Sequence, residues 1–164
     1  MAVLLVGCSG ESTPASDDVV ASASPRQSQS PTPSPAPSPT QAAKPGTRII
    51  ADWSPFGTML YDARGQAIYL FDREAGRPQP RCYGECATEW PPVLTDGPAV
   101  PGKGVRGELL GTAERRDGAT QVTYNGHPLY FYANEAPGEV LCHDFEEYGG
   151  IWYVVQPNGK RGAT

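Results

Sequence analysis

Alternating apolar and polar positions near the C-terminal end of the chain are typical of short β-strands. Residues 109–115, 119–124 and 127–133 form three such runs, separated by Arg116-Asp117-Gly118 and by Asn125-Gly126. Asp-Gly and Asn-Gly supply residues that accept positive φ, and Asn-Gly favours a tight two-residue turn. These runs therefore predict a three-stranded meander.

Similar runs occur upstream of the meander and downstream of it. Residues 58–61 lead through Asp62-Ala63-Arg64-Gly65 into residues 66–72, which predicts a hairpin with a longer loop. Residues 151–155 predict a further strand, which Pro157-Asn158-Gly159 ends. No segment has a convincing helical period. We therefore expect an all-β domain of antiparallel hairpins.

A ten-residue pattern occurs twice, at residues 65–74 and 126–135, and each copy has a turn glycine, aromatic residues two positions apart and a closing acid. Residues two apart share one face of a strand, so the aromatic pairs predict core packing, with hydroxyl groups bonded at its rim. Each closing acid is expected to accept backbone N–H groups of the following turn. The motif residues are Tyr69, Phe71 and Glu74 in the first copy and Tyr130, Tyr132 and Glu135 in the second.

The first residues resemble the end of a bacterial lipoprotein signal. Leu5-Val6-Gly7-Cys8 has the aliphatic, permissive and small residues that precede a lipidated cysteine, so Cys8 is the expected lipidation site. Acyl chains on Cys8 would hold the protein at a membrane. The apolar stretch of residues 1–8 is short and has no basic residue before it, so we expect a truncated signal.

Residues 9–45 are rich in Pro, Ser and Ala and have no aromatic side chain. Such a segment buries too little apolar surface to offset the entropy of ordering, so a disordered tether is expected. The β domain is then expected at residues 46–164, as one small domain with repeats at about 50–95 and 109–160. An extended tether reaches about 3 Å per residue.

Charge and hydropathy exclude several partners. The net charge of −5 argues against nucleic acid as a partner. No run of about 18 apolar residues is present, so membrane contact is expected only through the lipid on Cys8. The expected localisation is extracytoplasmic, anchored to the outer face of a bacterial cell membrane.

Three cysteines follow the tether, which leaves one thiol over after any single disulfide. In an oxidising compartment, Cys82 can pair with Cys86 across a short loop, or either can pair with Cys142 and tie the two halves together. A second hypothesis groups Cys82, Cys86, Cys142 and His143 as ligands of copper or zinc, with His127 or Met59 as a substitute ligand. A third is other redox chemistry at the same cysteines.

Other candidate sites are weaker. Asp144, Glu146 and Glu147 form an acidic cluster that predicts a solvated loop or a cation site. Arg115-Arg116 in the predicted hairpin turn indicates surface charge. No Ser–His–Asp set and no phosphate loop with the required spacing are present, so no catalytic residue is proposed.

Three features together resemble one family: the paired Tyr-x-aromatic-x-x-acid motifs, the segment 82–92 and the segment 149–159. The family is the secreted-repeat lipoproteins of unknown function, known by a Y-x-[FWY]-x-x-D motif. The resemblance covers nearly all of residues 50–160 and implies a localisation and a domain type, with no established activity. Both copies here have Glu where the family pattern has Asp. The linker and the residues around Cys8 resemble those of actinobacterial surface proteins.

The sequence thus predicts a lipid-anchored extracytoplasmic protein that binds a protein or ligand, or has a structural role, without enzymatic activity and without a cofactor. The alternative is a redox or copper- or zinc-binding protein of the cell envelope.

Overall fold

The structure is a computed structural model, and it describes Lys44 and residues 46–163. Cys8 and the expected signal of residues 1–8 lie outside the described residues, as does the expected tether of residues 9–45 apart from Lys44. The described residues belong to one compact unit. None of its helices is long and apolar enough to span a membrane.

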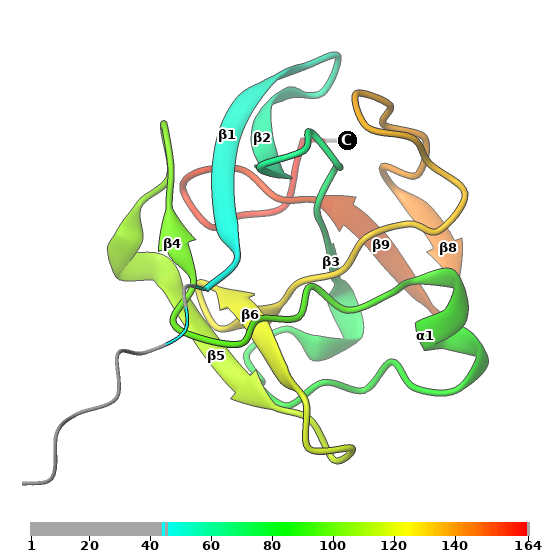
Figure 1. Ribbon diagram of the computed structural model, residues 1–164. Helices are drawn as coiled ribbons and strands as arrows, with labels where there is room; N and C mark the ends of the chain where they lie inside the picture. Colours follow the sequence, from blue (N-terminus) through cyan, green and yellow to red (C-terminus); the bar gives the residue numbers. More distant parts are fainter. Residues whose placement is uncertain (1–43, 45, 164) are drawn as a thin grey trace, which may run out of the picture. The chain divides into compact units, whose positions relative to one another are not determined.

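The first sheet is built on a hairpin of β1 (Arg48–Ser54) and β2 (Gly57–Asp62), with β4 (Val100–Pro101) parallel to β1. Gly57 has a φ of 87° in the connection, which a residue with a Cβ rarely adopts. β2 continues past the predicted strand of residues 58–61 at both ends. This hairpin and its sheet lie at the upper left of Figure 1.

The predicted hairpin of residues 58–61 with residues 66–72 is much reduced. It consists of one bridge, Tyr61 to Ala67, and strand β3 covers only Tyr69–Phe71. β3 pairs instead with β9 (Gly150–Val154), the strand predicted at residues 151–155, and β9 pairs on its other side with β8 (Phe145–Glu147). The strand of the first ten-residue motif therefore pairs with a strand of the second repeat.

The predicted meander is present as β5 (Leu110–Glu114), β6 (Thr120–Tyr124) and β7 (His127–Pro128). Asn125 and Gly126 have φ values of 49° and 76°, as the tight turn requires. The third strand is shorter than predicted because the backbone leaves β6 after Leu129, whose N–H still donates to the Val122 carbonyl oxygen. Tyr130 then forms bridges to Tyr69 and to Pro92.

One short helix was not predicted. Helix α1 (Glu85–Glu89) is a little over one turn long, so it cannot show a helical period in the sequence. Two 3₁₀ turns, Asp72–Glu74 and Gly107–Leu109, complete the regular structure of the described residues. The all-β prediction is confirmed: most regular residues lie in three small sheets (Figure 1).

Two hydrophobic clusters share the strands of the repeat motifs. Tyr69 and Phe71 lie in one cluster, and Ile68 and Leu70 lie in the other, as their alternation predicts. Tyr130 and Leu129 divide between the same two clusters. Both motif strands are therefore buried on both faces, which places them at the centre of the fold.

Candidate functional site

The two repeat motifs meet at their first tyrosines. The backbone N–H of Tyr69 donates to the Tyr130 carbonyl oxygen over 2.9 Å, and the Tyr130 N–H donates to the Tyr69 carbonyl oxygen over 3.0 Å. Both tyrosines are fully buried. This reciprocal pair places the two motifs side by side in antiparallel orientation.

The closing acids are exchanged between the repeats. The Tyr69 hydroxyl donates to Glu135 Oε1 over 2.6 Å, and the Tyr130 hydroxyl donates to Glu74 Oε1 over 2.8 Å. Each acid also accepts a backbone N–H from the segment that follows it, as predicted: Arg81 donates to Glu74, and Leu141 donates to Glu135, each over 2.5 Å. Each carboxyl group therefore joins its own turn to the tyrosine of the other copy.

Burial controls the charge of this centre. Desolvation raises the pKa of Glu74 and of Glu135, and the second oxygen of each carboxyl has no partner among the described residues. Desolvation also raises the pKa of Tyr69 and Tyr130 far above the ordinary tyrosine value, so both phenols stay protonated donors. Because Tyr69, Tyr130 and Glu74 expose none of their surface, no substrate in solution reaches them.

A symmetrical set of aromatic contacts surrounds the tyrosines. Trp90 and Trp152 stack with ring centroids 3.9 Å apart and an interplanar angle of 4°. Trp90 meets Tyr69 edge to face at 5.4 Å, and Trp152 meets Tyr130 in the same way at 5.2 Å. The two tryptophans come from the segments downstream of each motif, so these segments approach each other at the centre.

The second aromatic residue of each motif packs on the tryptophan of the other repeat. The Phe71 ring lies 4.3 Å from the Trp152 ring, and the Tyr132 ring lies 4.8 Å from the Trp90 ring. Aromatic pairs of this kind add about 0.5 to 1.5 kcal/mol each beyond their buried area. The motif aromatics therefore form the core that joins the repeats.

The cysteines have a single pairing. Cys82 and Cys86 form a disulfide, with Cα atoms 5.3 Å apart on either side of the start of α1. Cys142 is free and buried, so pairing of Cys82 or Cys86 with Cys142 is excluded. Cys86 lies four positions after Cys82. The residue four positions after Cys142 is Glu146, so the second repeat cannot form the equivalent disulfide. Burial raises the pKa of the Cys142 thiol to about 11, so it is protonated at neutral pH.

His143 is engaged at both ring nitrogens. Nδ1 accepts the Val154 backbone N–H over 3.3 Å, so Nε2 carries the proton and donates to the Ala163 carbonyl oxygen over 2.8 Å. The ring also lies 4.6 Å from the Phe56 ring. This histidine therefore fastens the end of the described chain to β9.

The proposed metal ligands do not form a cluster. Among residues 46–163, no group of three or more His, Cys, Asp or Glu side chains is placed to hold a metal ion. Cys82 and Cys86 lack thiolates because they are joined, and the substitute ligand Met59 lies in the hydrophobic core. Within the acidic cluster, Glu147 accepts the indole N–H of Trp90 over 2.7 Å.

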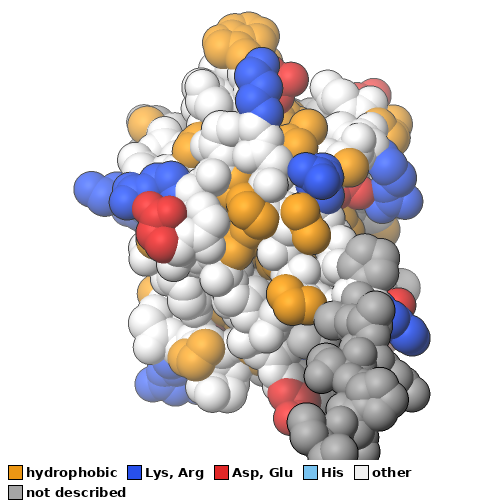
Figure 2. All heavy atoms as spheres, turned by 60° about the vertical axis from the view of Figure 1, so that its left-hand side comes forward, with side chains coloured by type: hydrophobic (Ala, Val, Ile, Leu, Met, Phe, Trp, Pro, Cys, Tyr) orange, Lys and Arg blue, Asp and Glu red, His pale blue; other side chains and the backbone are white. Residues whose placement is uncertain are grey.

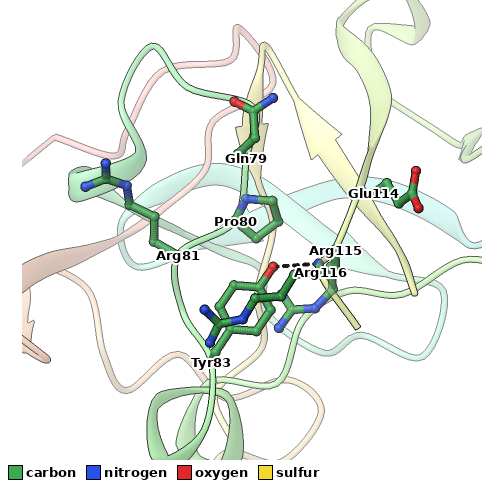
Figure 3. Close-up of a pocket in the computed structure, with 7 residues that line it drawn as sticks. All are labelled: Gln79, Pro80, Arg81, Tyr83, Glu114, Arg115 and Arg116. Atoms are coloured by element: carbon green, nitrogen blue, oxygen red, sulfur yellow. Dashed lines mark hydrogen bonds between the residues drawn. The ribbon is translucent and has the colours of Figure 1, made fainter. Parts of the chain in front are cut away.

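A cationic groove of about 670 Å³ lies on the described surface. Residues 79–81, Tyr83 and residues 114–116 line it, so it joins the segment after the first motif to the β5–β6 turn (Figure 3). The expectation that Arg115 is a surface charge is wrong, because it is only 3 % exposed. Its guanidinium donates to Gln121 Oε1 and to the Cys82 carbonyl oxygen.

Hydrophobic side chains are dispersed on one face of the described surface (Figure 2). Figure 2 shows a face on which they form separate small groups, with Lys and Arg side chains projecting around them. The most exposed large one is Trp53 in the β1–β2 hairpin, at 74 % exposure. The groove, with its charged walls, is therefore the candidate ligand site that this surface offers.

Comparison with known proteins identifies the repeats. A family model described as a secreted repeat of unknown function matches residues 54–94 and 111–156. Neither curated proteins nor solved structures gave a match. The two matched segments correspond to the two copies that exchange their tyrosine–glutamate hydrogen bonds, and the description as secreted agrees with the expected extracytoplasmic location. The chain belongs to this family of secreted repeats of unknown function.

Proposed function

We propose that the chain is a lipid-anchored extracytoplasmic protein whose β domain is a non-enzymatic binding scaffold. One observation carries the proposal: the residues that define the repeats form the contacts that join the two repeats to each other. Tyr69, Tyr130, Glu74 and Glu135 are buried and pair among themselves or with the backbone. A site that acts on a substrate needs such groups within reach of it.

The cysteine arrangement supports the scaffold over a redox role. Thiol–disulfide exchange requires an accessible thiolate. Cys142 is buried, and its pKa is raised by that burial. The Cys82–Cys86 disulfide closes the segment that contains Tyr83, beside the groove. Its proposed role is to fix this segment.

Attachment through Cys8 is the part of the proposal that fractionation tests. The full chain, exported behind the basic and apolar regions of a known lipoprotein signal with Leu5-Val6-Gly7-Cys8 retained, is expected in the membrane fraction, with acyl mass on its N-terminal peptide. The matched variant Cys8→Ser is expected in the soluble extracytoplasmic fraction. Equal partition of the two proteins, or an unmodified Cys8, would contradict the proposal.

A further inference from the structure

The groove contains two arginines whose charges nothing in the described structure neutralises. Arg115 is buried and donates one hydrogen bond each to Gln121, to the Cys82 carbonyl oxygen and to Asp117. Arg81 and Arg116 are both exposed, and neither guanidinium has an ion pair or a hydrogen bond among residues 46–163. The chain as a whole has a net charge of −5, so the positive charge of this groove is opposite in sign to the net charge of the chain.

Tyr83 holds one of these arginines in place. The Arg116 guanidinium carbon lies 3.8 Å from the centroid of the Tyr83 ring, and the Arg115 guanidinium carbon lies 4.3 Å from it. The Tyr83 hydroxyl also accepts the Arg116 backbone N–H over 3.1 Å. Figure 3 shows the Arg116 side chain over the ring. A guanidinium stacked in this way keeps its N–H donors available while it loses rotamer freedom in advance of binding.

The walls that carry these side chains are tied together. The disulfide between Cys82 and Cys86 brackets Tyr83, and the Cys82 carbonyl oxygen accepts a hydrogen bond from Arg115 over 3.0 Å. The acid in the lining, Glu114, points away from the Tyr83 ring in Figure 3. The wall that holds Arg116 is therefore a fixed frame, whereas the Arg81 side chain extends away from the Tyr83 ring (Figure 3).

We propose that this groove binds a phosphate group of a phosphate ester through Arg116, with Arg81 adding a second positive charge to the lining. A planar guanidinium donates two parallel N–H groups to phosphate oxygens. A phosphate monoester has up to two negative charges on three terminal oxygens, whereas acetate has one charge on two oxygens. A hollow of about 670 Å³ is large enough for the organic part of such an ester.

The test uses the full chain with Cys8→Ser, so that no acyl chain contributes to binding. Glycerol 3-phosphate, inorganic phosphate and acetate are titrated in a calorimeter at constant ionic strength, and vesicles of phosphatidylglycerol are compared with vesicles of phosphatidylcholine. We expect both soluble phosphates to bind more tightly than acetate. Arg116→Gln is expected to weaken phosphate binding about tenfold or more, since it removes a charge-assisted contact, and Arg81→Gln is expected to weaken it less, since it removes only a nearby charge.

Arg161→Gln is the matched control. Arg161 is also exposed and also stacks on a tyrosine, with its guanidinium carbon 4.7 Å from the Tyr153 ring centroid, but it does not line the groove. Its loss is expected to leave phosphate binding unchanged. Tyr83→Ala, which keeps both arginines, is expected to weaken binding because Arg116 loses its support.

The outcomes separate the source of the phosphate from the proposal itself. Binding of the soluble phosphates that depends on Arg116 supports the proposal. Arg116-dependent binding confined to phosphatidylglycerol vesicles also supports it and identifies a lipid headgroup as the source. The proposal is overturned if acetate binds measurably and as tightly as phosphate, if neither the soluble phosphates nor the phosphatidylglycerol vesicles bind, or if Arg161→Gln weakens binding as much as Arg116→Gln. None of these results depends on the lipidation of Cys8.

Discussion

The exchange of glutamates between repeats can be tested by double-mutant cycles. Within one motif, Tyr69 and Glu74 are five residues apart, whereas the structure pairs Tyr69 with Glu135 over 2.6 Å. Tyr69→Phe removes the donor, and Glu135→Gln removes the charge of the acceptor while it keeps the shape. The control cycle combines Tyr69→Phe with Glu74→Gln, two residues that share no hydrogen bond in the structure.

The expected magnitude follows from the geometry and from burial. A buried hydrogen bond to a charged acceptor contributes about 1.5 to 3 kcal/mol, and one to a neutral acceptor about 1 kcal/mol. Burial raises the pKa of Glu135, so its carboxyl is less fully charged than an exposed one. We therefore expect a coupling energy of about 1 to 2 kcal/mol between Tyr69 and Glu135. The control cycle is expected to be additive within about 0.5 kcal/mol.

Urea unfolding followed by tryptophan fluorescence measures both cycles, because Trp90 and Trp152 are buried in the centre that unfolds. The disulfide is kept intact so that a two-state analysis applies. A coupling energy that is as large within a repeat as between repeats would refute the exchanged pairing.

Two further predictions concern the effect of Glu74 on the pH dependence of stability and the structural role of His143. Burial raises the pKa of Glu74 above its ordinary value of 4.5, so the folded state binds this proton more tightly than the unfolded state. The contribution of the protonated Glu74 carboxyl to stability is fully present below the ordinary pKa of this group. It is lost as the pH rises through the raised pKa of the folded state. The stability of the unmodified chain relative to Glu74→Gln is thus expected to fall from pH 4.5 to neutral pH, which urea midpoints at both pH values measure; a constant difference would contradict the burial argument. His143→Ala removes a hydrogen bond from the partly buried Val154 N–H and one to the exposed Ala163 carbonyl oxygen, so the unfolding free energy is expected to fall by about 1 kcal/mol. Unchanged urea unfolding would show that this histidine has no structural role.

Local patterns in the sequence predicted local structure well. Alternation placed Tyr69 and Phe71 on one face and Ile68 and Leu70 on the other, because the period of two is a property of any strand. The turn at Asn125-Gly126 was predictable because these residues accept positive φ.

Long-range partners were not predictable from the same patterns. Nothing in residues 66–72 indicates that β3 leaves its own hairpin and pairs with β9. The pairing of Cys82 with Cys86, among three open alternatives, depends on the turn of α1, which is too short to show a period. The burial of Arg115 depends on its hydrogen bond to Gln121, which is itself buried and which no local pattern indicates as a partner.

The groove illustrates the same division. Arg115-Arg116 was visible in the sequence as a charged turn, but the ring of Tyr83 lies more than thirty residues away along the chain. Only the folded structure shows that Arg115 is buried and hydrogen-bonded to Gln121, whereas the Arg116 guanidinium stacks on the Tyr83 ring.

The central claim is that the motif residues and cysteines build the frame, and thiol counting with metal analysis tests it most directly. Native Cys8→Ser chain is treated with a thiol reagent, then unfolded, then reduced. We predict no reaction in the native state, one thiol from Cys142 on unfolding, two more from Cys82 and Cys86 after reduction, and no stoichiometric copper or zinc. A Cys142 that reacts in the native state, or one bound metal ion per chain, would contradict the account.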